Sequence, residues 1–560
     1  MYIKWLQKGR AILLAAAIVA GTAFMSTGTA YAAVSLTGSI SGCAIASDKN
    51  NITISLSSGG DAAGTDGNVY VFELQPYEKA IGTRTDYIAS ATAGSGTSVN
   101  VALNLGKADD RLYSKFVLAA YDGTQFVEIS SPHYVTNPEI VAKNQAEFRD
   151  PLTKKGLNIE LSMLADAFDL GVKHVATNIA FSQIMGTGID YVYDGKTYHF
   201  NKTIMEDYDK IISALSGKSM TVTAIILNDW NDNTPDLVYP GTQKSSSANY
   251  YMFNAATQAG VEQTKAIASF LAERYNGSDP NHGTVSNWII GNEINNQIWN
   301  YMGPADINTY LTAYQSAFRL FYTAIKSTSA NDRVYFSLDY WWGAPYEHKN
   351  NQVNYRGKDI VDTFNSMAQT QGQMDWGLAY HPYPYPMTEP EFWDDVNTGE
   401  VTQDASSSVV NFANLSVLTD YFQQDSLKTA SGQVRHIILT EEGFSSQSAS
   451  KGTVTDIQAA AFAYSYYLVD SNPYIDAYIL SRQVDAPAEV NIGLRFGLWE
   501  CDMSKPNLIV ATKRKKIWQV FRDIDKKKDT IEATEFAKSI IGINKWSDVI
   551  PNFRWRNQEQ

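Results

Sequence analysis

The stretch Trp288-Ile289-Ile290-Gly291-Asn292-Glu293-Ile294-Asn295-Asn296 decides how the rest of the chain is interpreted. It is a short apolar run that ends abruptly in an amide, a carboxylate and further amides. A buried strand is expected to end in a turn residue such as Gly or Pro, because an unpaired carboxylate is costly to bury. The simplest physical reason for Glu293 is that the strand delivers its side chain to a site that needs an acid.

Apolar strands and helical patterns alternate from Pro138 to Asp525. Strict alternation of this kind predicts a parallel sheet, which is either doubly wound or closed as a barrel. In addition to the strand that ends at Glu293, the predicted strands are 174–181, 220–227, 333–339, 374–381, 434–441 and 475–481. An eighth strand, near 157–159, has the weakest pattern.

A closed barrel is favoured over a doubly wound sheet for two reasons. The segment from Asn178 to Gly186 has no glycine fingerprint of the kind that a dinucleotide-binding sheet requires. Polar and aromatic residues also follow nearly every strand, and in a (β/α)8 TIM barrel all such positions meet at the C-terminal mouth. These residues are Asn228-Asp229-Trp230-Asn231, Asn292-Glu293, Asp339-Tyr340-Trp341-Trp342, His381-Pro382-Tyr383 and Glu441-Glu442.

The N-terminus has the pattern of a bacterial-type signal peptide. Lys4, Lys8 and Arg10 precede the apolar run 11–20, and Ala30-Tyr31-Ala32 forms a small-residue cleavage site. We therefore expect residues 1–32 to be removed and the protein to be secreted, either extracellular or associated with the cell surface. No other run reaches the roughly 18 apolar residues of a membrane span.

The charge of the chain limits its partners. The formal net charge is −14, and loss of the basic signal residues makes the mature chain still more acidic. An acidic chain argues against nucleic acid or an anionic membrane surface as a partner. Many of the 12 Trp and 33 Tyr are expected to be core residues, although secreted sugar-binding proteins also need aromatic faces for the apolar sides of pyranose rings.

Residues 33–137 differ in character from the barrel segment. They are rich in Gly, Ser and Thr and contain short alternating runs at 51–56, 68–74 and 98–103. The run 116–121, then Asp122-Gly123, then 126–129 predicts a β-hairpin. We interpret the segment as a small β-sandwich, which could bind carbohydrate or only brace the barrel of residues 138–525; without a clear ligand signature, bracing is favoured. A C-terminal helix and tail, 526–560, is expected to pack on that barrel.

Two strand ends supply a pair of carboxylates. Glycoside hydrolysis needs one carboxyl group to protonate the leaving oxygen and another to attack the sugar or to activate water. Glu293 and Glu441 meet this requirement at the predicted fourth and seventh strands.

The residues around both glutamates resemble a known family. Gly291-Asn292-Glu293 and Leu439-Thr440-Glu441-Glu442-Gly443 resemble the acid/base and nucleophile motifs of the clan A retaining glycoside hydrolases, over about residues 140–525. The resemblance implies a (β/α)8 barrel that cleaves β-glycosidic bonds of an oligo- or polysaccharide by double displacement. Glu293 would be the general acid and then the base, and Glu441 the nucleophile, with carboxyl groups about 5 Å apart.

The same resemblance implies further roles. Asn292 would bind the 2-hydroxyl of the sugar, Tyr383 would donate to the nucleophile, and His381 would line the same subsite. The complete set of expected substrate-binding residues is Asn292, His381, Tyr383, Asn178, Asn228, Trp341, Trp342 and Trp499. Trp341 and Trp342 are candidate stacking platforms, although only one of two neighbours on a strand can face the mouth.

The chain departs from the clan at two strand ends. Clan members commonly carry an Arg at the end of strand two, where this chain has Asn178. They commonly carry a Trp at the end of strand eight, where this chain has Ser481-Arg482-Gln483, and Trp499 is a candidate substitute from the following loop. These differences indicate an outlying family.

Several alternatives stand beside this interpretation. Glu442 is the inward carboxylate if Glu441 is a solvated turn residue, although the motif favours Glu441. The barrel could instead be a non-catalytic glycan-binding protein of the cell exterior. A metal-dependent deacetylase or phosphodiesterase is less favoured, because seven scattered histidines fit a metal cluster poorly.

Neither a metal nor an organic cofactor is predicted. Asp523-Ile524-Asp525 is similar to the start of a calcium loop, but Lys527, Lys528 and Thr534 occupy positions that need a ligand, a Gly and a bidentate Glu. Cys43 and Cys501 are the only cysteines and lie in different predicted domains, so two unpaired thiols are favoured over a disulfide.

Overall fold

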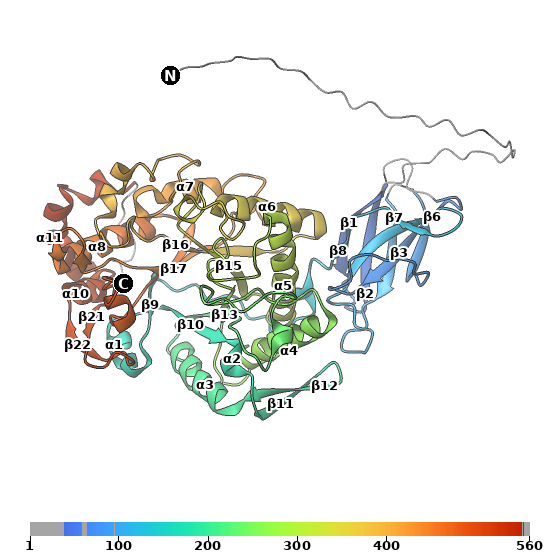
Figure 1. Cartoon of the computed structure of the whole chain (residues 1–560), viewed down its shortest axis with the longest axis horizontal. Helices are drawn as coiled ribbons and strands as arrows, with labels where there is room; N and C mark the ends of the chain where they lie inside the picture. The colour runs from blue at the N-terminus through green and yellow to red at the C-terminus, as the bar shows by residue number, and fades with distance from the viewer. Residues whose placement is uncertain (1–37, 59–63, 95, 552, 554–560) are drawn as a thin grey trace, which may run out of the picture.

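The computed structural model describes residues 38–58, 64–94, 96–551 and 553, and its centre is a closed barrel of eight parallel strands (Figure 1). The strands close in the order β10-β13-β14-β15-β16-β17-β20-β9. Their bounds are β9 Lys155–Asn158, β10 His174–Ala180, β13 Thr221–Leu227, β14 Asn287–Ile290, β15 Arg333–Asp339, β16 Trp376–His381, β17 Ile437–Glu442 and β20 Ile475–Leu480. The predicted TIM barrel is confirmed, and β9 is the strand with the weakest sequence pattern.

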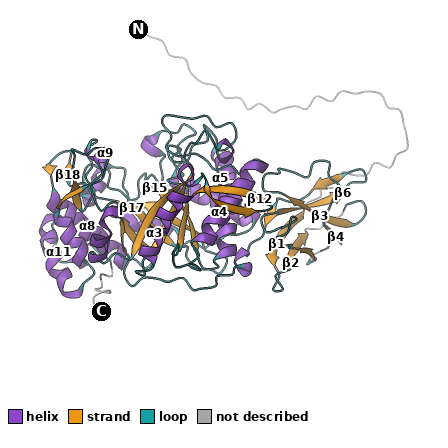
Figure 2. Ribbon diagram, turned by 90° about the horizontal axis from the view of Figure 1, so that it is seen from below, coloured by secondary structure: helices purple, strands orange, loops and turns teal. Residues whose placement is uncertain are grey.

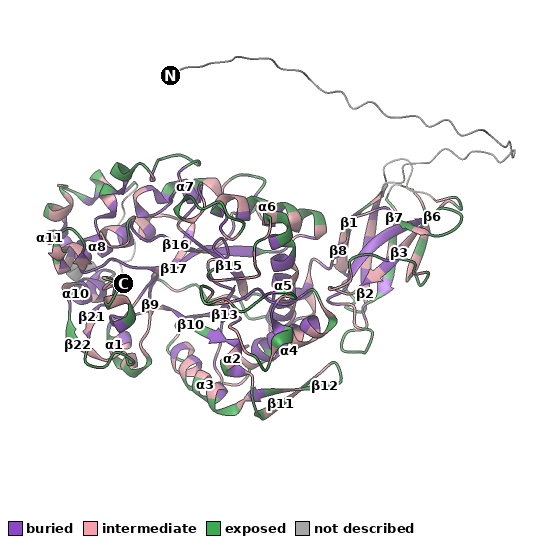
Figure 3. Cartoon of the chain, viewed as in Figure 1, coloured by how far each residue is buried: buried purple, intermediate pink, exposed green. Residues whose placement is uncertain are grey.

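The two faces of the barrel strands pack differently. Small or aliphatic side chains and one tyrosine fill the interior, namely Ala176, Ala180, Ile225, Leu227, Ile289, Tyr335, Ala379, Ile438, Ala477 and Ile479. The outward side chains pack against the helices in a much larger apolar core. Because both faces are covered, the barrel strands are buried almost throughout (Figure 3).

Helices of unequal length surround the barrel. Their bounds are α1 Leu164–Asp169, α2 Phe181–Ile184, α3 Lys202–Ser216, α4 Gln258–Arg274, α5 Ile307–Thr328, α6 Gly357–Gln371, α7 Leu415–Tyr421, α8 Thr455–Ser471 and α9 Pro487–Val490. The long helices α4 and α5 begin at good N-caps, because Thr257 accepts from the Gly260 N–H and Asp306 accepts from the Asn308 and Thr309 N–H groups. Three short hairpins extend the barrel loops: β11 Gly188–Tyr193 with β12 Lys196–Asn201, β18 Gln447–Ser448 with β19 Gly452–Thr453, and β21 Trp499–Cys501 with β22 Ala511–Arg514.

The described residues before the barrel form two antiparallel sheets. One has the order β1-β2-β5, and the other has β4-β3-β6-β7 with β8 paired to β6. The bounds are β1 Gly38–Ile45, β2 Asn51–Ser58, β3 Asn68–Leu74, β4 Ala89–Thr92, β5 Ser98–Ala102, β6 Lys115–Tyr121, β7 Phe126–Glu128 and β8 His133–Tyr134. The predicted hairpin is β6–β7, and the predicted signal peptide lies outside the described residues.

Cationic side chains of the barrel helices reach aromatic rings of this all-strand segment. The Arg319 guanidinium on α5 lies 4.6 Å from the Tyr134 ring centroid, and its Nη2 donates to the Gly372 carbonyl at 2.6 Å. Lys265 Nζ on α4 lies 4.6 Å from the Tyr113 ring centroid. These contacts fasten the sheets to the barrel wall.

The chain ends on the other side of the barrel. Helices α10 Lys516–Asp523 and α11 Lys527–Ile541 both pack against α8, away from the all-strand segment (Figure 2). Trp546 continues this contact, with its ring centroid 4.7 Å from that of Tyr467 on α8. Cys43 and Cys501 are both buried and unpaired, as expected.

Candidate active site

Glu293 stands just beyond the end of β14 in an unusual backbone conformation. The strand ends at Ile290, and both Gly291 and Glu293 have positive φ angles, of 80° and 39°. Glycine adopts this region freely, whereas a residue with a side chain rarely does. The turn leaves the Glu293 side chain 13% exposed at the wall of a pocket in the barrel mouth.

Glu441 on β17 lines the same pocket, and its neighbour Glu442 does not. The Glu441 side chain is 33% exposed, whereas Glu442 is fully buried and neither of its carboxyl oxygens has a hydrogen-bond partner among the described residues. Burial raises the pKa of Glu442 well above its usual value, and the charge of Glu441 adds to the rise. Strand alternation therefore leaves Glu441 as the carboxylate that reaches the pocket.

His381, at the end of β16, contacts both glutamates. Its Nδ1 lies 2.7 Å from Glu293 Oε1 and 3.8 Å from Glu441 Oε2, and its Nε2 lies 3.2 Å from Thr440 Oγ1. The Tyr383 hydroxyl donates to Glu441 Oε1 at 3.2 Å. The ends of β14, β16 and β17 thus bring one histidine, one tyrosine and two carboxylates together. His381 and Tyr383 are themselves buried and outside the pocket lining, so they contact the glutamates and do not line the pocket as predicted.

The electrostatics of this cluster favour retention of a proton. Burial raises the pKa of Glu293, the nearby charge of Glu441 raises it further, and the hydrogen bond to His381 opposes the rise. Burial alone would lower the pKa of His381, but the hydrogen bond to Glu293 and the surrounding carboxylates leave it raised. Both shifts stabilise the protonated Glu293–His381 pair, as a general acid requires.

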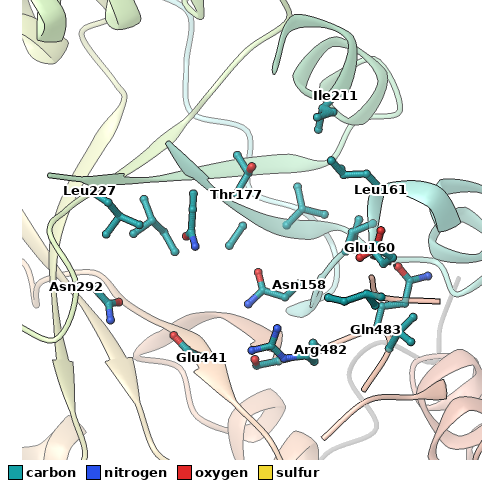
Figure 4. Close-up of a pocket in the computed structure, with 18 of the residues that line it drawn as sticks. Asn158, Glu160, Leu161, Thr177, Ile211, Leu227, Asn292, Glu441, Arg482 and Gln483 are labelled. Carbon is teal, nitrogen blue, oxygen red and sulfur yellow. Dashed lines mark hydrogen bonds between the residues drawn. The ribbon is translucent and has the colours of Figure 1, made fainter. Parts of the chain in front are cut away.

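The pocket has a volume of about 360 Å³ and extends from the two glutamates towards β9 and β10. Asn292 and Asn178, both predicted, line it, and so do Asn158 and Thr177, which the sequence analysis missed. Figure 4 shows Asn292 and Glu441 on one side of this space and Asn158 across from them. Such convergent amides and hydroxyls are suited to the hydroxyl groups of a sugar.

Arg482 is the pocket-lining cation that sequence reasoning left out of the site. It follows β20, and its guanidinium points towards Glu441 (Figure 4). Its Nη2 is paired with Glu489 Oε1, whereas its Nε is buried without a partner among the described residues. The sequence feature that could have identified Arg482 as a site residue is its position at the end of strand eight, where the clan commonly has a tryptophan.

The aromatic lining comes from loop residues that the sequence analysis did not select. Tyr250 and Trp299 line the pocket beside Glu293, with ring centroids 6.1 Å apart and planes inclined at 32°. Both rings are partly exposed. They are positioned as a stacking surface for a sugar ring.

The prediction that Trp341 and Trp342 are stacking platforms is wrong. Trp341 is 1% exposed and packs with Ala344, Val401 and Val409, and Trp342 is fully buried in the main core. The loop after β15 directs both rings into the protein interior, so neither reaches the pocket.

Asn228 and Trp499 are also wrongly predicted. Asn228 is buried, and its Nδ2 donates to the Leu237 and Met252 carbonyls, so that it fixes the loop after β13 instead of lining the pocket. Trp499 donates from Nε1 to Asp166 Oδ2 at 2.9 Å, outside the pocket lining. It braces β21 against α1 and does not replace the missing tryptophan of strand eight.

The described residues contain no cluster of three or more His, Cys, Asp or Glu side chains that could hold a metal ion. Within the same part of the chain, no helix is both long and apolar enough to cross a bilayer.

The fold and the site define a (β/α)8-barrel protein with two glutamates at the mouth, on strands four and seven of the barrel. The chain belongs to a family of unknown function (DUF5722), whose model matches residues 147–549. No curated protein matches the sequence.

Solved structures with a similar course of the backbone include three glycosidases. A family 39 glycoside hydrolase from the gut symbiont Bacteroides cellulosilyticus WH2 is 15% identical, over 84% of this chain and 78% of that chain, with a TM-score of 0.43. A family 1 β-glucosidase from Thermotoga maritima is 15% identical, over 64% and 84%, with a TM-score of 0.39. A Ruminococcus gnavus β-glucuronidase is 12% identical, over 87% and 68%, with a TM-score of 0.34.

Proposed function

We propose that the protein is a retaining glycoside hydrolase of the clan A type that cleaves β-glycosidic bonds. The observation that carries this proposal is the contact of one ring nitrogen, His381 Nδ1, with both Glu293 at 2.7 Å and Glu441 at 3.8 Å. In retaining enzymes the two carboxyl groups are about 5–5.5 Å apart, whereas in inverting enzymes they are roughly 6.5–9.5 Å apart and leave room for a water molecule. Two carboxyl groups that contact the same ring nitrogen favour the shorter, retaining arrangement.

The proposed reaction has two displacements. Glu441 attacks the anomeric carbon and forms a glycosyl ester, while Glu293 gives its proton to the departing glycosidic oxygen. Glu293, now a carboxylate, then takes a proton from water, whose oxygen attacks the same carbon and releases Glu441. The raised pKa of Glu293 supports the first proton transfer, and the partial exposure of Glu441 supports its access to the sugar.

The neighbours of the two glutamates support these roles. The Tyr383 hydroxyl, 3.2 Å from Glu441 Oε1, orients the nucleophile and stabilises its charge. His381 holds the Glu293 carboxyl through the 2.7 Å contact between its Nδ1 and Glu293 Oε1. Asn292, next to the acid, is positioned for the 2-hydroxyl of the sugar, where a hydrogen bond strengthens in the transition state.

A substrate screen followed by matched variants tests the proposal. Aryl β-glycosides and a polysaccharide panel, with detection of reducing sugar, should reveal a substrate that the wild-type protein hydrolyses. Glu441→Gln should lower kcat/KM on that substrate by about 10³-fold or more, and Glu293→Gln should do so on a polysaccharide or another glycoside whose leaving oxygen needs a proton. Glu442→Gln is the matched control and should stay within a few-fold of wild type, because that carboxyl is buried outside the pocket lining.

Two outcomes would overturn the proposal. Full activity in either pocket variant would remove the assigned acid or nucleophile. Glycan binding without release of reducing ends would support the non-catalytic, glycan-binding alternative instead. The anomeric configuration of the first product, followed by NMR, should be that of the substrate.

We further propose that the enzyme is exported and that its two N-terminal sheets form a bracing β-sandwich. The basic and apolar pattern of residues 1–32 supports export, and the Arg319–Tyr134 and Lys265–Tyr113 contacts support bracing. N-terminal sequencing of protein from the culture medium should begin at Ala33. A mature N-terminus at Met1 would contradict the signal-peptide prediction.

A further inference from the structure

The backbone around Glu293 is held by the neighbouring strand, β15. The regular pairing of β14 with β15 stops at Ile289 and Tyr335, and β15 then continues to Asp339. The part of β15 beyond the pairing therefore lies beside the turn that carries Glu293. Alternation along β15 puts Tyr335, Ser337 and Asp339 on one face, and Tyr335 belongs to the barrel interior.

Ser337 makes two hydrogen bonds to this turn. Its Oγ accepts the Glu293 N–H at 2.8 Å, and its carbonyl accepts the Ile294 N–H at 3.0 Å. Ser337 is fully buried, so water does not compete for either bond. The first bond fixes the N–H of the very residue whose φ is 39°.

Asn295 and Asp339 form a second link two residues further along both segments. Asn295 Nδ2 donates to Asp339 Oδ1 at 2.5 Å, and the Asp339 N–H donates to Asn295 Oδ1 at 3.0 Å. The same Asp339 oxygen accepts the Trp341 N–H at 2.8 Å. Both side chains are buried, and their paired bonds join the loop after β14 to the end of β15.

We propose that Ser337 and the Asn295–Asp339 pair are positioning residues that hold the acid/base glutamate in its left-handed conformation and so aim its carboxyl group at the leaving oxygen. This inference rests on the proposed glycosidase function. A residue with a side chain stays in this region only when its surroundings hold it there, and the hydrogen bonds from β15 are those surroundings. None of the three side chains lines the pocket, so their effect passes through Glu293.

The inference predicts a loss that depends on the leaving group. A misaimed acid should slow hydrolysis of glycosides whose leaving oxygen needs a proton, and should not slow those whose leaving group departs as a stable anion. The test therefore uses a matched pair, the phenyl and the 2,4-dinitrophenyl β-glycosides of the sugar that the wild-type enzyme hydrolyses in the substrate screen.

Ser337→Ala removes the acceptor of the Glu293 N–H. It should lower kcat/KM on the phenyl glycoside by about 10- to 100-fold and leave the dinitrophenyl glycoside within about twofold of wild type. Asp339→Ala should show the same pattern. Asp339→Asn should recover most of the loss, because its amide oxygen still accepts from Asn295 and Trp341.

Two controls separate positioning from simple destabilisation and from failure of the proposed function. Ser465→Ala removes an equally buried hydroxyl, bonded to Tyr478 on the outer side of the barrel, and should not change the ratio of the two substrates. Glu293→Gln must itself show the leaving-group dependence. If it does not, the proposed function fails, whereas an equal loss on both substrates in Ser337→Ala alone overturns the positioning role.

A crystal structure of Ser337→Ala gives a readout that needs no substrate. Glu293 should leave the left-handed region, and the distance from its carboxyl group to His381 Nδ1 should rise above the present 2.7 Å. An unchanged Glu293 backbone and an unchanged contact to His381 would overturn the inference, whatever the kinetics show.

Discussion

His381 Nδ1 lies 2.7 Å from Glu293 Oε1, while Nε2 of the same ring lies 3.2 Å from Thr440 Oγ1, one residue before Glu441. The imidazole therefore ties Glu293, the proposed acid at the end of β14, to the strand that carries Glu441, the proposed nucleophile. A ring bonded at both nitrogens cannot rotate freely, so the proton that it shares with Glu293 has a fixed direction.

Replacement of His381 should move the pH profile. The hydrogen bond and the charge of His381 both lower the pKa of Glu293, against the larger effect of burial. In His381→Asn, loss of the imidazolium charge should let the pKa of Glu293 rise, so that the acid stays protonated to higher pH. We expect the basic limb of kcat/KM against pH to shift upward and kcat to fall about 10- to 100-fold. A downward shift of that limb would contradict the assigned effect of His381 on Glu293.

Most of the barrel could be predicted from the sequence, because its strands are apolar runs bounded by polar residues. The exception, β9, reads Lys155-Gly156-Leu157-Asn158 and carries little apolar signal of its own. The sequence predicts a strand near 157–159 because the barrel needs an eighth, whereas its observed bounds depend on the pairing of β10 and β20 with it on either side. That information is tertiary and is not available in a local pattern.

The site could be predicted where strand ends define it, and not where loops do. Glu293, Glu441 and His381 follow directly from the ends of strands. Trp341 and Trp342 come just after β15, and their burial depends on contacts with residues far along the chain, such as Val409 for Trp341 and Tyr421 for Trp342. Tyr250 and Trp299 lie in long loops, whose course also depends on distant contacts. Strand periodicity therefore cannot predict that their rings line the pocket.

Azide should identify the nucleophile. Glu441→Gly removes the carboxylate proposed to attack the sugar, and the space left beside the anomeric carbon would admit a small anion. We expect activity on a dinitrophenyl glycoside to fall by about 10³-fold or more and to be partly restored by sodium azide, with a glycosyl azide of inverted configuration as the product. NMR of that product is the measurement.

The matched variant for this experiment is Glu442→Gly. Glu442 points away from the pocket, so azide should have no effect on the residual activity of the variant. Rescue of Glu442→Gly, without rescue of Glu441→Gly, would exchange the two assignments.

Trp299 should matter for binding, and Trp342 for stability. Trp299→Ala removes a partly exposed ring of the pocket wall, and we expect KM to rise about 3- to 10-fold with a smaller change in kcat. Trp342→Ala opens a cavity in the core and should lower the free energy of unfolding by about 3–5 kcal/mol, with KM unchanged while the protein stays folded. A raised KM in Trp342→Ala alone would restore that residue to the site.

A buried ion pair holds the loop that follows β20 and carries Arg482. Lys515 Nζ lies 2.7 Å from Asp485 Oδ1, and the two side chains are 1% and 0% exposed. Burial raises the pKa of Asp485 and lowers that of Lys515, so each charge depends on the other. Lys515→Met leaves the carboxylate unpaired, and we expect the free energy of unfolding, measured with denaturant, to fall by about 3–5 kcal/mol.

The control for the buried ion pair is a solvent-exposed ion pair. A double variant then separates the effect of lost charge pairing from the effect of lost packing. Lys428→Met breaks a solvated contact with Asp425 and should cost no more than about 1 kcal/mol. Replacing both buried partners, in Lys515→Met with Asp485→Leu, should recover part of the loss, because no unpaired charge then remains. Recovery will be incomplete, since Asp485 also accepts the Gly497 N–H at 2.8 Å. If Lys515→Met were no more harmful than Lys428→Met, the loop would be held by its backbone contacts alone, and the ion pair would not be what positions Arg482 in the pocket.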